Sequence, residues 1–559
     1  MTAFGIDFGT TNSVIATFSS AGLEVLPVDQ PPAAWAGRGL EGVLPSVVAF
    51  TDDGGPVFGW AAKRLPRSLR AAKRLLRDTD VMTDGESTFE VEEVATMLFK
   101  HLATASPGGY SIDSAVVTVP ANSPGAPRHR TKVCAGMAGI RVPALINEPT
   151  AAAMAAGYRG ALDGTLMVVD WGGGTLDVTV LRCVDGIYIE EASAGVGRLG
   201  GLDFDAAIRR TIEEGAPNAS SWHEAGISAE YLLDIERAKV DLSSHDSANV
   251  QLPDGSVRRL TREEFDRIAR PLVERVRDPI ERCLADLSGQ PIDRLVLVGG
   301  TCNMPAVRPL PSAFVGWPAI PAGTPTTGPA GGAAIAAAIL DGDLDEHDFF
   351  VSTEHALGTI AVDSRMEPVF SVIIPRNHKL PAKRTEMYTP IRDFQTGIDF
   401  QIIEGDPDRP LDDRENVIYD TLEVDLPGRA MVDASVEATL EYDVDGLLHV
   451  SVHDVATGAA LGQHTITFGA AGDPRRRVEI AKRVQATFDD GRRSGATGGD
   501  ESLSAEAAKV VAVARTKVLP FVDEPEREEI DAMIQAIVDG ASSEPLDLMV
   551  RRRWPYLLD

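Results

Sequence analysis

The fold is decided by a pattern that occurs twice, first as Phe4-Gly5-Ile6-Asp7-Phe8-Gly9-Thr10-Thr11-Asn12-Ser13 and again as Met167-Val168-Val169-Asp170-Trp171-Gly172-Gly173-Gly174-Thr175-Leu176-Asp177. In each copy an apolar run ends in an Asp, a glycine turn with a hydroxyl residue follows, and a second apolar run begins. Each copy therefore predicts a hairpin with an acid at its mouth. Two such hairpins predict a duplicated α/β fold that closes on a nucleotide from both sides.

The residues at the two turns are those that phosphate binding needs. Glycine lets backbone N–H groups approach phosphate oxygens without obstruction by a Cβ. Asp7, Asp170 and Asp177 would repel a phosphate directly, so they indicate a Mg²⁺ ion that bridges carboxylate and phosphate through water. Hydroxyl donors come from Thr10, Thr11 and Thr175. One glycine hairpin alone is as often an ordinary turn, but a matched pair with matched acids favours a phosphate site.

A third glycine element follows an apolar run, in Leu295-Val296-Leu297-Val298-Gly299-Gly300-Thr301. It predicts a buried strand that ends in a glycine pair before a helix. Backbone at such a turn can approach a ribose or a phosphate closely. Taken alone, the element is more often a plain connection between a strand and a helix.

These motifs occur in an order that resembles the DnaK-type 70-kDa heat-shock chaperones of the actin-like ATPase superfamily. The two hairpins resemble the phosphate motifs of that family, and Leu295 to Thr301 resembles its adenosine motif. Further matches are the connecting segments Val116 to Ala121, Ile146 to Ala153 and Gly331 to Ile335, and the strand pair Asp443 to Ser451 of its peptide-binding β-domain. The resemblance covers about residues 1–470, and the segment Ile146 to Ala153 is close to diagnostic.

The resemblance implies an ATPase site that binds ATP or ADP with Mg²⁺, with K⁺ as a further candidate ion. Glu148 would position the attacking water and Lys73 would neutralise charge on the γ-phosphoryl group. Mg²⁺ would be held by Asp7 and Asp170 through water, with Asp177 and Thr175 completing the catalytic set. The residues implied in nucleotide binding are Gly9, Thr10, Thr11, Asn12, Gly172, Gly173, Gly174, Glu236, Lys239, Ser243, Gly299, Gly300, Thr301 and Asn303. Without the resemblance, Lys73 reads as a solvated lysine among neighbouring arginines.

Several positions depart from the family pattern. Asn303 stands where family members often place an arginine against the adenine, and Val240 stands where some carry a second one. Loss of such stacking weakens base binding by about 1 kcal/mol. In the stretch 121–127, Pro124, Gly125 and Pro127 predict a loose loop where the family begins a helix.

The chain divides into four parts. Residues 1–346 alternate strand-like and helix-like patterns and predict the ATPase domain. Residues 347–354 predict an apolar linker, in which Phe349, Phe350 and Val351 would dock on the ATPase in one nucleotide state; an edge strand explains them equally. Residues 355–470 predict an antiparallel β-sandwich. Residues 471–559 predict a shortened helical tail or lid, with helical patterns at 476–488, 504–519 and 525–539.

In the predicted sandwich, the resemblance implies a groove for an extended apolar peptide. Tyr388, Ile391, Ile398 and Phe400 would line it, with Ile398 at the central pocket. An ordinary sandwich core explains the same residues without a ligand. Pro120 and Arg128 match family positions that relay between domains, so we expect them to act with the linker in an interdomain relay.

Composition restricts the class of partner. The 559 residues carry a net charge of −30, which disfavours nucleic acid and anionic membranes. The four cysteines lie far apart and are expected to be reduced. The N-terminus lacks the pattern of a signal peptide, and no apolar run is long enough to span a membrane. We therefore expect a cytoplasmic monomer.

The favoured hypothesis is an ATP-dependent molecular chaperone. ATP hydrolysis would control the capture and release of unfolded or extended apolar polypeptide by the β-domain. A J-domain-type co-chaperone and a nucleotide-exchange factor are the partners that the resemblance implies. One alternative is an ATP-binding scaffold or regulator with little hydrolysis. A remote alternative is a small-molecule kinase or a filament protein of the same superfamily.

Overall fold

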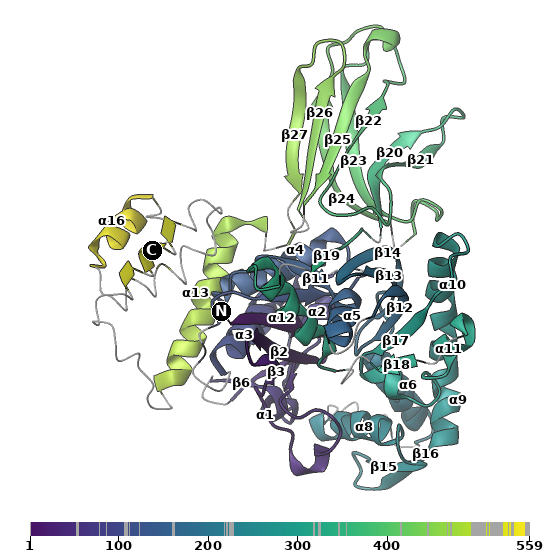
Figure 1. Ribbon diagram of the computed structural model, residues 1–559, viewed down its shortest axis with the longest axis vertical. Helices are drawn as coiled ribbons and strands as arrows, with labels where there is room; N and C mark the ends of the chain where they lie inside the picture. The colour runs from purple at the N-terminus through teal and green to yellow at the C-terminus, as the bar shows by residue number, and fades with distance from the viewer. Residues whose placement is uncertain are drawn as a thin grey trace.

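Two six-stranded sheets form the N-terminal α/β part of this computed structural model (Figure 1). The structure describes residues 2–51, 55–77, 79–84, 86–105, 110, 112–121, 123–158, 162–216, 219, 222, 228–316, 319–321, 326–344, 347–353, 355–413, 416–443, 447–466, 468–469, 472–493, 510, 514, 529–530, 532–534, 536–537 and 542–553. Each sheet is built around one of the two predicted hairpins. The α/β prediction is therefore confirmed.

The first sheet has the strand order β11-β10-β1-β2-β3, with β4 paired to β2. Its hairpin consists of β1 (Ala3–Phe8) and β2 (Asn12–Ser19), which pair antiparallel. The other strands are β3 (Gly22–Leu26), β4 (Leu44–Pro45), β10 (Val116–Val119) and β11 (Leu145–Asn147). Because β10 pairs parallel with β1 and is buried throughout, its sequence is β-branched at every position, three valines and Thr118, rather than alternating apolar and exposed polar residues.

The second sheet has the order β18-β17-β12-β13-β14-β19. Its hairpin consists of β12 (Gly164–Trp171) and β13 (Leu176–Val184), which pair antiparallel. The other strands are β14 (Ile187–Val196), β17 (Arg294–Val298), β18 (Ala319–Pro321) and β19 (Asp348–Phe350). Here β17 pairs parallel with β12, as β10 does with β1. The two sheets therefore repeat one arrangement.

Two alanine-rich helices, α5 (Glu148–Tyr158) and α12 (Gly328–Leu340), pack against each other, α12 also against β1 and α5 also against β12. Small residues let their backbones approach closely. A Cβ at Gly332 would lie 1.7 Å from the carbonyl oxygen of Ala151, and one at Gly5 would lie 2.1 Å from the amide of Ala334. The contact between the two sheets therefore depends on glycine.

The remaining helices and the smaller sheets of the α/β part lie around the two large sheets. Around the first sheet lie β5 (Val47–Phe50), β6 (Pro56–Phe58), α1 (Gly59–Lys63), β7 (Leu69–Arg70), α2 (Ala72–Leu75), β8 (Val81–Thr83), β9 (Thr88–Glu90), α3 (Val91–Ala105) and α4 (Gly125–Met137). Around the second lie α6 (Gly201–Glu214), α8 (Ala229–Asp241), β15 (Ser247–Gln251), β16 (Val257–Thr261), α9 (Arg262–Val273), α10 (Arg277–Asp286) and α11 (Leu310–Val315).

The prediction of a loose loop over 121–127 is wrong for its second half. Helix α4 begins at Gly125, directly after Pro124. Pro127 lies in the first turn, where a backbone amide has no intrahelical acceptor, so the missing N–H costs nothing there.

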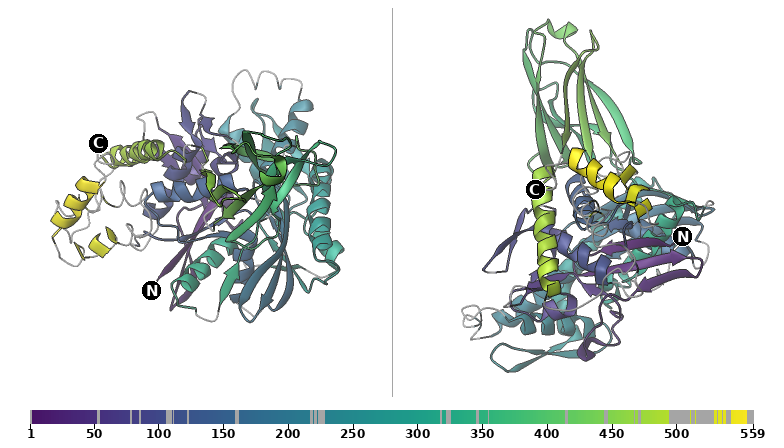
Figure 2. Two further views of the ribbon diagram at one scale, coloured as in Figure 1. Left: turned by 90° about the horizontal axis from the view of Figure 1, so that it is seen from above. Right: turned by 90° about the vertical axis from the view of Figure 1, so that its left-hand side faces the viewer.

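A β-sandwich stands above the α/β part (Figures 1 and 2). One sheet has the order β21-β20-β23-β24 and the other β22-β25-β26-β27. The strands are β20 (Ala356–Val362), β21 (Pro368–Ile374), β22 (Ala382–Tyr388), β23 (Gly397–Gly405), β24 (Val417–Asp425), β25 (Val436–Tyr442), β26 (Leu448–Asp454) and β27 (Ala460–Ile466).

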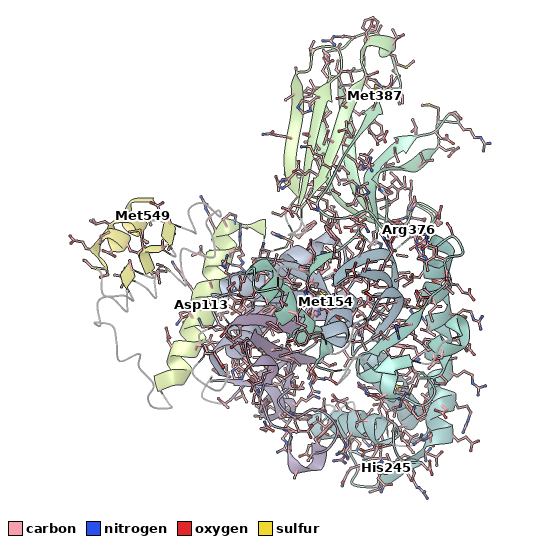
Figure 3. All side chains as sticks on the ribbon, in the orientation of Figure 1. Asp113, Met154, His245, Arg376, Met387 and Met549 are labelled. Atoms are coloured by element: carbon pink, nitrogen blue, oxygen red, sulfur yellow. The ribbon has the colours of Figure 1, made fainter. Side chains whose placement is uncertain are left out.

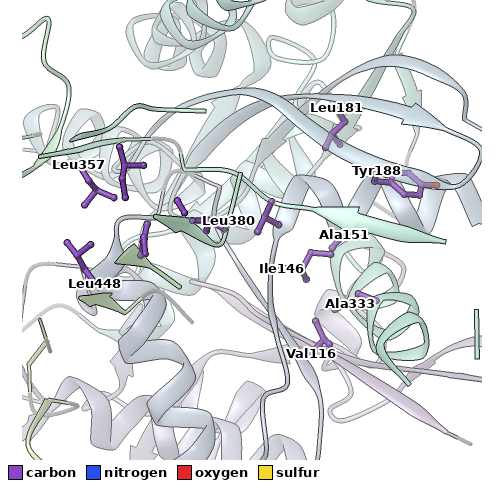
Figure 4. Packing of buried hydrophobic residues seen from close by; sticks show 14 of the residues in the cluster. Val116, Ile146, Ala151, Leu181, Tyr188, Ala333, Leu357, Leu380 and Leu448 are labelled. Atoms are coloured by element: carbon purple, nitrogen blue, oxygen red, sulfur yellow. The ribbon is translucent and has the colours of Figure 1, made fainter. Parts of the chain in front are cut away.

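One apolar cluster continues from the α/β part into the sandwich (Figure 4). It includes Val116, Ile146 and Ala333 below the junction and Leu357, Leu380 and Leu448 above it. The strand β19 lies at this junction. It pairs parallel with β14, so the predicted linker is also an edge strand of the second sheet.

In the tail, α13 (Pro474–Arg493) packs against α3, and α16 (Glu544–Arg553) lies apart from it (Figure 2). The helix predicted over 476–488 is present within α13. The patterns at 504–519 and 525–539 fall largely outside the described residues. Arg483 pairs with Glu93 at 2.8 Å, and the Phe488 ring lies 5.5 Å from that of Phe58. None of the helices in the described ranges is both long and apolar enough to cross a membrane.

The approach of α12 to α5 predicts a large cost for any side chain at Gly332. Gly332→Ala should lower the free energy of unfolding by about 2 kcal/mol or more, because the new methyl group has no space. Denaturant unfolding would measure the change. Gly136→Ala in α4 is the matched control: a Cβ there meets nothing within 4 Å, so we expect a gain of about 0.5 kcal/mol. Equal effects of the two substitutions would contradict this account of the packing.

Candidate functional site

The predicted acids meet where the two hairpins face each other. Asp7 is the last but one residue of β1, and Asp170 is the last but one of β12. Asp177 lies at the start of β13, while Glu148 begins α5 from the carboxyl end of β11. Lys73, in α2, donates a hydrogen bond to Glu148. The Lys73 side chain is only 6% exposed, so it is not the solvated lysine of the alternative interpretation.

Burial and mutual repulsion raise the pKa values of two carboxylates of this cluster, Asp7 and Asp170. The pKa of Asp7 is raised to about 6, mainly by burial and also by the charge of Glu148, while Lys73 and a 2.7 Å hydrogen bond from Thr118 oppose the shift. Burial also raises the pKa of Asp170 well above its ordinary value, with added repulsion from Glu148 and the other aspartates. The cluster thus carries more negative charge than Lys73 neutralises, which fits a divalent cation.

No three His, Cys, Asp or Glu side chains in the described part of the chain form a direct metal site. An ion among these carboxylates would therefore be held mainly by water and by phosphate oxygens, as Mg²⁺ commonly is. When Asp7 and Asp170 are ionised, their carboxylates can only accept hydrogen bonds, so they can hold the water molecules that surround such an ion.

The three glycine elements close around a small cavity of about 80 Å³. A Cβ at Gly173 would lie 2.4 Å from the Thr11 side chain, and one at Gly174 would lie 2.5 Å from the Thr10 hydroxyl. Gly299, with φ of 85°, would place a Cβ 2.3 Å from a backbone oxygen. The predicted residues that line the cavity are Asp7, Gly9, Thr10, Thr11, Asn12, Lys73, Pro120, Glu148, Asp170, Gly172, Gly173, Gly174, Thr175, Gly299 and Gly300. The size and the backbone cradle fit phosphate groups.

A larger cavity of about 570 Å³ opens beside it, a size usual for small-molecule ligands. The predicted residues on its wall are Thr11, Asn12, Gly172, Gly173, Glu236, Lys239, Ser243, Gly300, Thr301 and Asn303. His245, labelled in Figure 3, also lines it, as does Val240. Lys239 donates to the carbonyl of Gly201 at 2.9 Å and to Asp205 at 2.8 Å. The cavity fits the nucleoside part of a nucleotide whose phosphates enter the glycine cradle.

The sequence prediction missed one wall of this cavity, the segment 35–40, which we term the cap segment. Arg38 in this segment donates two hydrogen bonds, at 2.8 and 2.5 Å, to Asp241 at the end of α8. The pair joins the two sides of the cleft, as do Lys63 with Glu236 at 2.7 Å and Arg74 with Asp203 at 2.9 Å. A tryptophan and an arginine set among glycines were the signal available in the sequence.

The cap segment is anchored by aromatic rings. Trp35 is buried, its ring centroid lies 4.9 Å from that of Trp60, and the Lys63 ammonium lies 5.4 and 4.9 Å from the two centroids. Gly37 and Gly39 take φ values of 75° and 72°, which few other residues adopt without strain. The backbone can therefore turn to present Arg38 to the cavity.

The predicted relay residues are Pro120, Arg128 and three residues of the linker itself. Arg128 is buried and donates to the Asn147 side chain at 2.6 Å. Val351 is buried, Phe349 is half-buried against the shared apolar cluster, and Phe350 is 40% exposed. Pro120 lines the small cavity.

The predicted groove residues differ in burial. Phe400 is buried with its ring 5.6 Å from Tyr388, and Ile398 is half-buried beside the same cluster. Ile391 is exposed, as is Met387 at the outer part of the sandwich (Figure 3). The peptide groove therefore stays a prediction.

A sequence profile of the family described as Hsp70 protein matches residues 65–537. This chain belongs to the Hsp70 family. Three relatives, each named Chaperone protein DnaK, come from Thermotoga neapolitana, Thermotoga petrophila and Thermotoga maritima. Each is 34% identical over 524 residues, which cover 86% of this chain and 83% of the relative. The sequence resemblance is thereby confirmed.

The raised pKa of Asp7 predicts that ionised Asp7 lowers the free energy of unfolding of this Hsp70 chain, by an amount that depends on pH. Its pKa is about 6 in the folded protein against 3.8 as the ordinary value, so the folded state binds the extra proton and loses stability as pH rises between these values. Asp7→Asn should therefore raise the free energy of unfolding by about 1–2 kcal/mol at about pH 7.5 without nucleotide or metal, and by much less near pH 4. Asp399→Asn, at an exposed position of β23, is the control. A gain independent of pH would contradict the assignment.

The Arg38–Asp241 pair predicts slow nucleotide release. Because the pair joins the two sides of the large cavity, Arg38→Ala should speed dissociation of a fluorescent ADP analogue about fivefold in stopped-flow measurements. The double variant Arg38→Asp with Asp241→Arg should recover part of the slow rate. Arg258→Ala removes a pair that does not cross the cavity and should leave the rate unchanged. Equal rates for Arg38→Ala and the unmodified chain would contradict a role for the cap segment.

Proposed function

We propose that the cleft binds and hydrolyses ATP and that its nucleotide state controls the capture of extended apolar polypeptide by the sandwich. Membership of the Hsp70 family makes the chain an ATP-hydrolysing molecular chaperone. The observation that carries the residue-level proposal is the meeting of two glycine turns, a buried lysine and a cluster of carboxylates at one cavity. We assign residues 1–346 to the ATPase domain, 347–354 to the linker, 355–470 to the peptide-binding domain and 471–559 to the tail.

In this proposal, Lys73 and Glu148 act as a pair. Phosphoryl transfer needs positioning and charge neutralisation more than covalent help. The Lys73 ammonium would lie against the transferred group, and its hydrogen bond would hold Glu148 in the orientation that aligns a water molecule. Mg²⁺ bound with the nucleotide would neutralise charge on the phosphate oxygens, near Asp7 and Asp170. The glycine cradle and the hydroxyls of Thr10, Thr11 and Thr175 would fix the phosphates.

Contacts between the sandwich and the ATPase domain support control of one by the other. Glu404 of β23 accepts a hydrogen bond from the Gly125 amide at 3.0 Å, so a carboxylate of the sandwich caps the first turn of α4, where anions are favoured. Asp406 pairs with Arg282 at 2.9 Å. Arg376, at the junction in Figure 3, pairs with Asp286 at 2.6 Å.

The finer parts of the proposal concern partners. Exposed apolar segments of unfolded polypeptide are the proposed client, bound near Tyr388, Ile391, Ile398 and Phe400 once the sandwich opens. A J-domain-type co-chaperone and a nucleotide-exchange factor would adjust the cycle. A cytoplasmic monomer is the proposed form.

ATP turnover of the purified chain, with and without an unfolded apolar peptide, tests the proposal. We expect slow turnover that rises with peptide, and a loss of about 100-fold or more in Lys73→Ala, because that variant removes the charge beside the transferred group. Lys383→Ala, an exposed lysine of the sandwich, is the control. Turnover that is indifferent to every peptide would contradict control by the sandwich. Turnover that survives in Lys73→Ala would contradict the site.

A further inference from the structure

Glu190 lies in β14 directly after the three residues that pair with the linker strand. Ile187, Tyr188 and Ile189 are in register with Asp348, Phe349 and Phe350. The Glu190 carboxylate then accepts a hydrogen bond from the Ser352 amide at 2.8 Å. Its backbone oxygen accepts from the Ser352 hydroxyl at 3.1 Å and from Lys379 at 3.0 Å. The side chain and the backbone of Glu190 therefore both extend the docking of the linker.

The same carboxylate also contacts the segment that carries Glu148. The Asn147 amide nitrogen lies 3.0 Å from each carboxylate oxygen of Glu190, and the Thr150 hydroxyl donates to one of them. Asn147 ends β11 and Thr150 lies in the first turn of α5, so these two residues flank Glu148. One carboxylate thus joins the linker to a residue on each side of the proposed water-positioning residue.

Arg128 fixes the orientation of the Asn147 amide. Its guanidinium donates to the Asn147 side-chain oxygen at 2.6 Å. The Asn147 nitrogen must then face away from Arg128, toward a group that only accepts. An ionised Glu190 is such a group, so the same orientation of the Asn147 amide satisfies both Arg128 and Glu190.

Burial makes these contacts costly to lose. Glu190 is 1% exposed and Asn147 and Thr150 are as deeply buried. A buried carboxylate deprived of donors is strongly destabilised. Glu190 lines neither the 80 Å³ cavity nor the 570 Å³ cavity, so it does not act by touching the nucleotide.

We propose that Glu190 is a positioning residue that couples docking of the linker to the orientation of Glu148. With the linker docked, the Ser352 amide completes the donor set of Glu190, and the carboxylate holds Asn147 and Thr150 on either side of Glu148. When the linker leaves, this donor leaves with it, water reaches the carboxylate, and Glu148 loses its fixed support. The inference rests on the proposed role of Glu148 in ATP hydrolysis.

Glu190→Gln in the full-length chain tests the inference. The amide keeps the shape of the side chain but replaces one acceptor by a donor, which opposes the donors of Ser352 and Asn147. We expect kcat for ATP to fall about tenfold or more while nucleotide affinity stays within about twofold, because small displacements of a catalytic group lower the rate without changing binding. Hydrogen exchange of the amides in residues 348–352 should rise in the same variant.

Glu191→Gln is the matched control, since Glu191 lies next in the chain but pairs with the exposed Arg182 at 3.0 Å. Unchanged kcat in Glu190→Gln would overturn the inference, and so would a fall in kcat with unchanged exchange of the linker amides.

If Glu190→Gln does not fold, Ser352→Pro removes the amide donor while Glu190 stays in place, and it should lower kcat in the same way. Absence of Lys73-dependent turnover in the unmodified chain would instead reject the proposed function. Unchanged linker exchange in Glu190→Gln would still reject the link between Glu190 and the linker.

Discussion

Repulsion among buried carboxylates is the constraint on which the rest of this structure depends. Asp7, Asp170, Asp177 and Glu148 come from separate elements and converge on one buried point, where Lys73 is the nearby cation that lowers the pKa of both Asp7 and Asp170. Such an arrangement opposes folding, because each charge loses hydration without full compensation. The packing of the two sheets and the α5–α12 contact must therefore offset the destabilisation that the buried carboxylates cause.

The same constraint explains why ion pairs, rather than apolar contacts, join the two sides of the cleft at its opening. Arg38, Lys63 and Arg74 each pair with an acid on the opposite side. Ion pairs at a partly hydrated mouth hold the two sides together with modest energies, so the cleft can close on a ligand and still open. An apolar contact of equal area would keep the cleft closed, because the stabilising free energy of apolar burial grows with the whole area that is buried.

Local patterns made the glycine turns and their acids predictable, since strand, turn and hydroxyl lie within about ten residues of one another. The cap segment was not predictable in this way. Trp35 and Arg38 lie in a stretch rich in Pro, Ala and Gly with no periodicity, and their partners Trp60 and Asp241 are distant in sequence. Glu190 was missed for the same reason: beside Glu191 it reads as one of two solvent-facing acids in the first half of a strand. Its burial depends on Asn147 and Ser352, which only the assembled fold brings to it. The loop predicted over 121–127 failed because proline disfavours a helix interior but not its first turn.

The placement of Glu190 also bears on how the chain distinguishes its own strand from a foreign one. Without β19, the edge of β14 would present free backbone groups, and open edges attract extended apolar segments. A chaperone meets such segments constantly, so an open edge inside its own ATPase domain would be a hazard. A carboxylate set into this edge rejects an apolar strand, since burying it without donors is costly. The linker brings the Ser352 amide to that carboxylate and the Ser352 hydroxyl to the backbone oxygen of Glu190. It therefore makes a hydroxyl contact that an apolar client segment lacks.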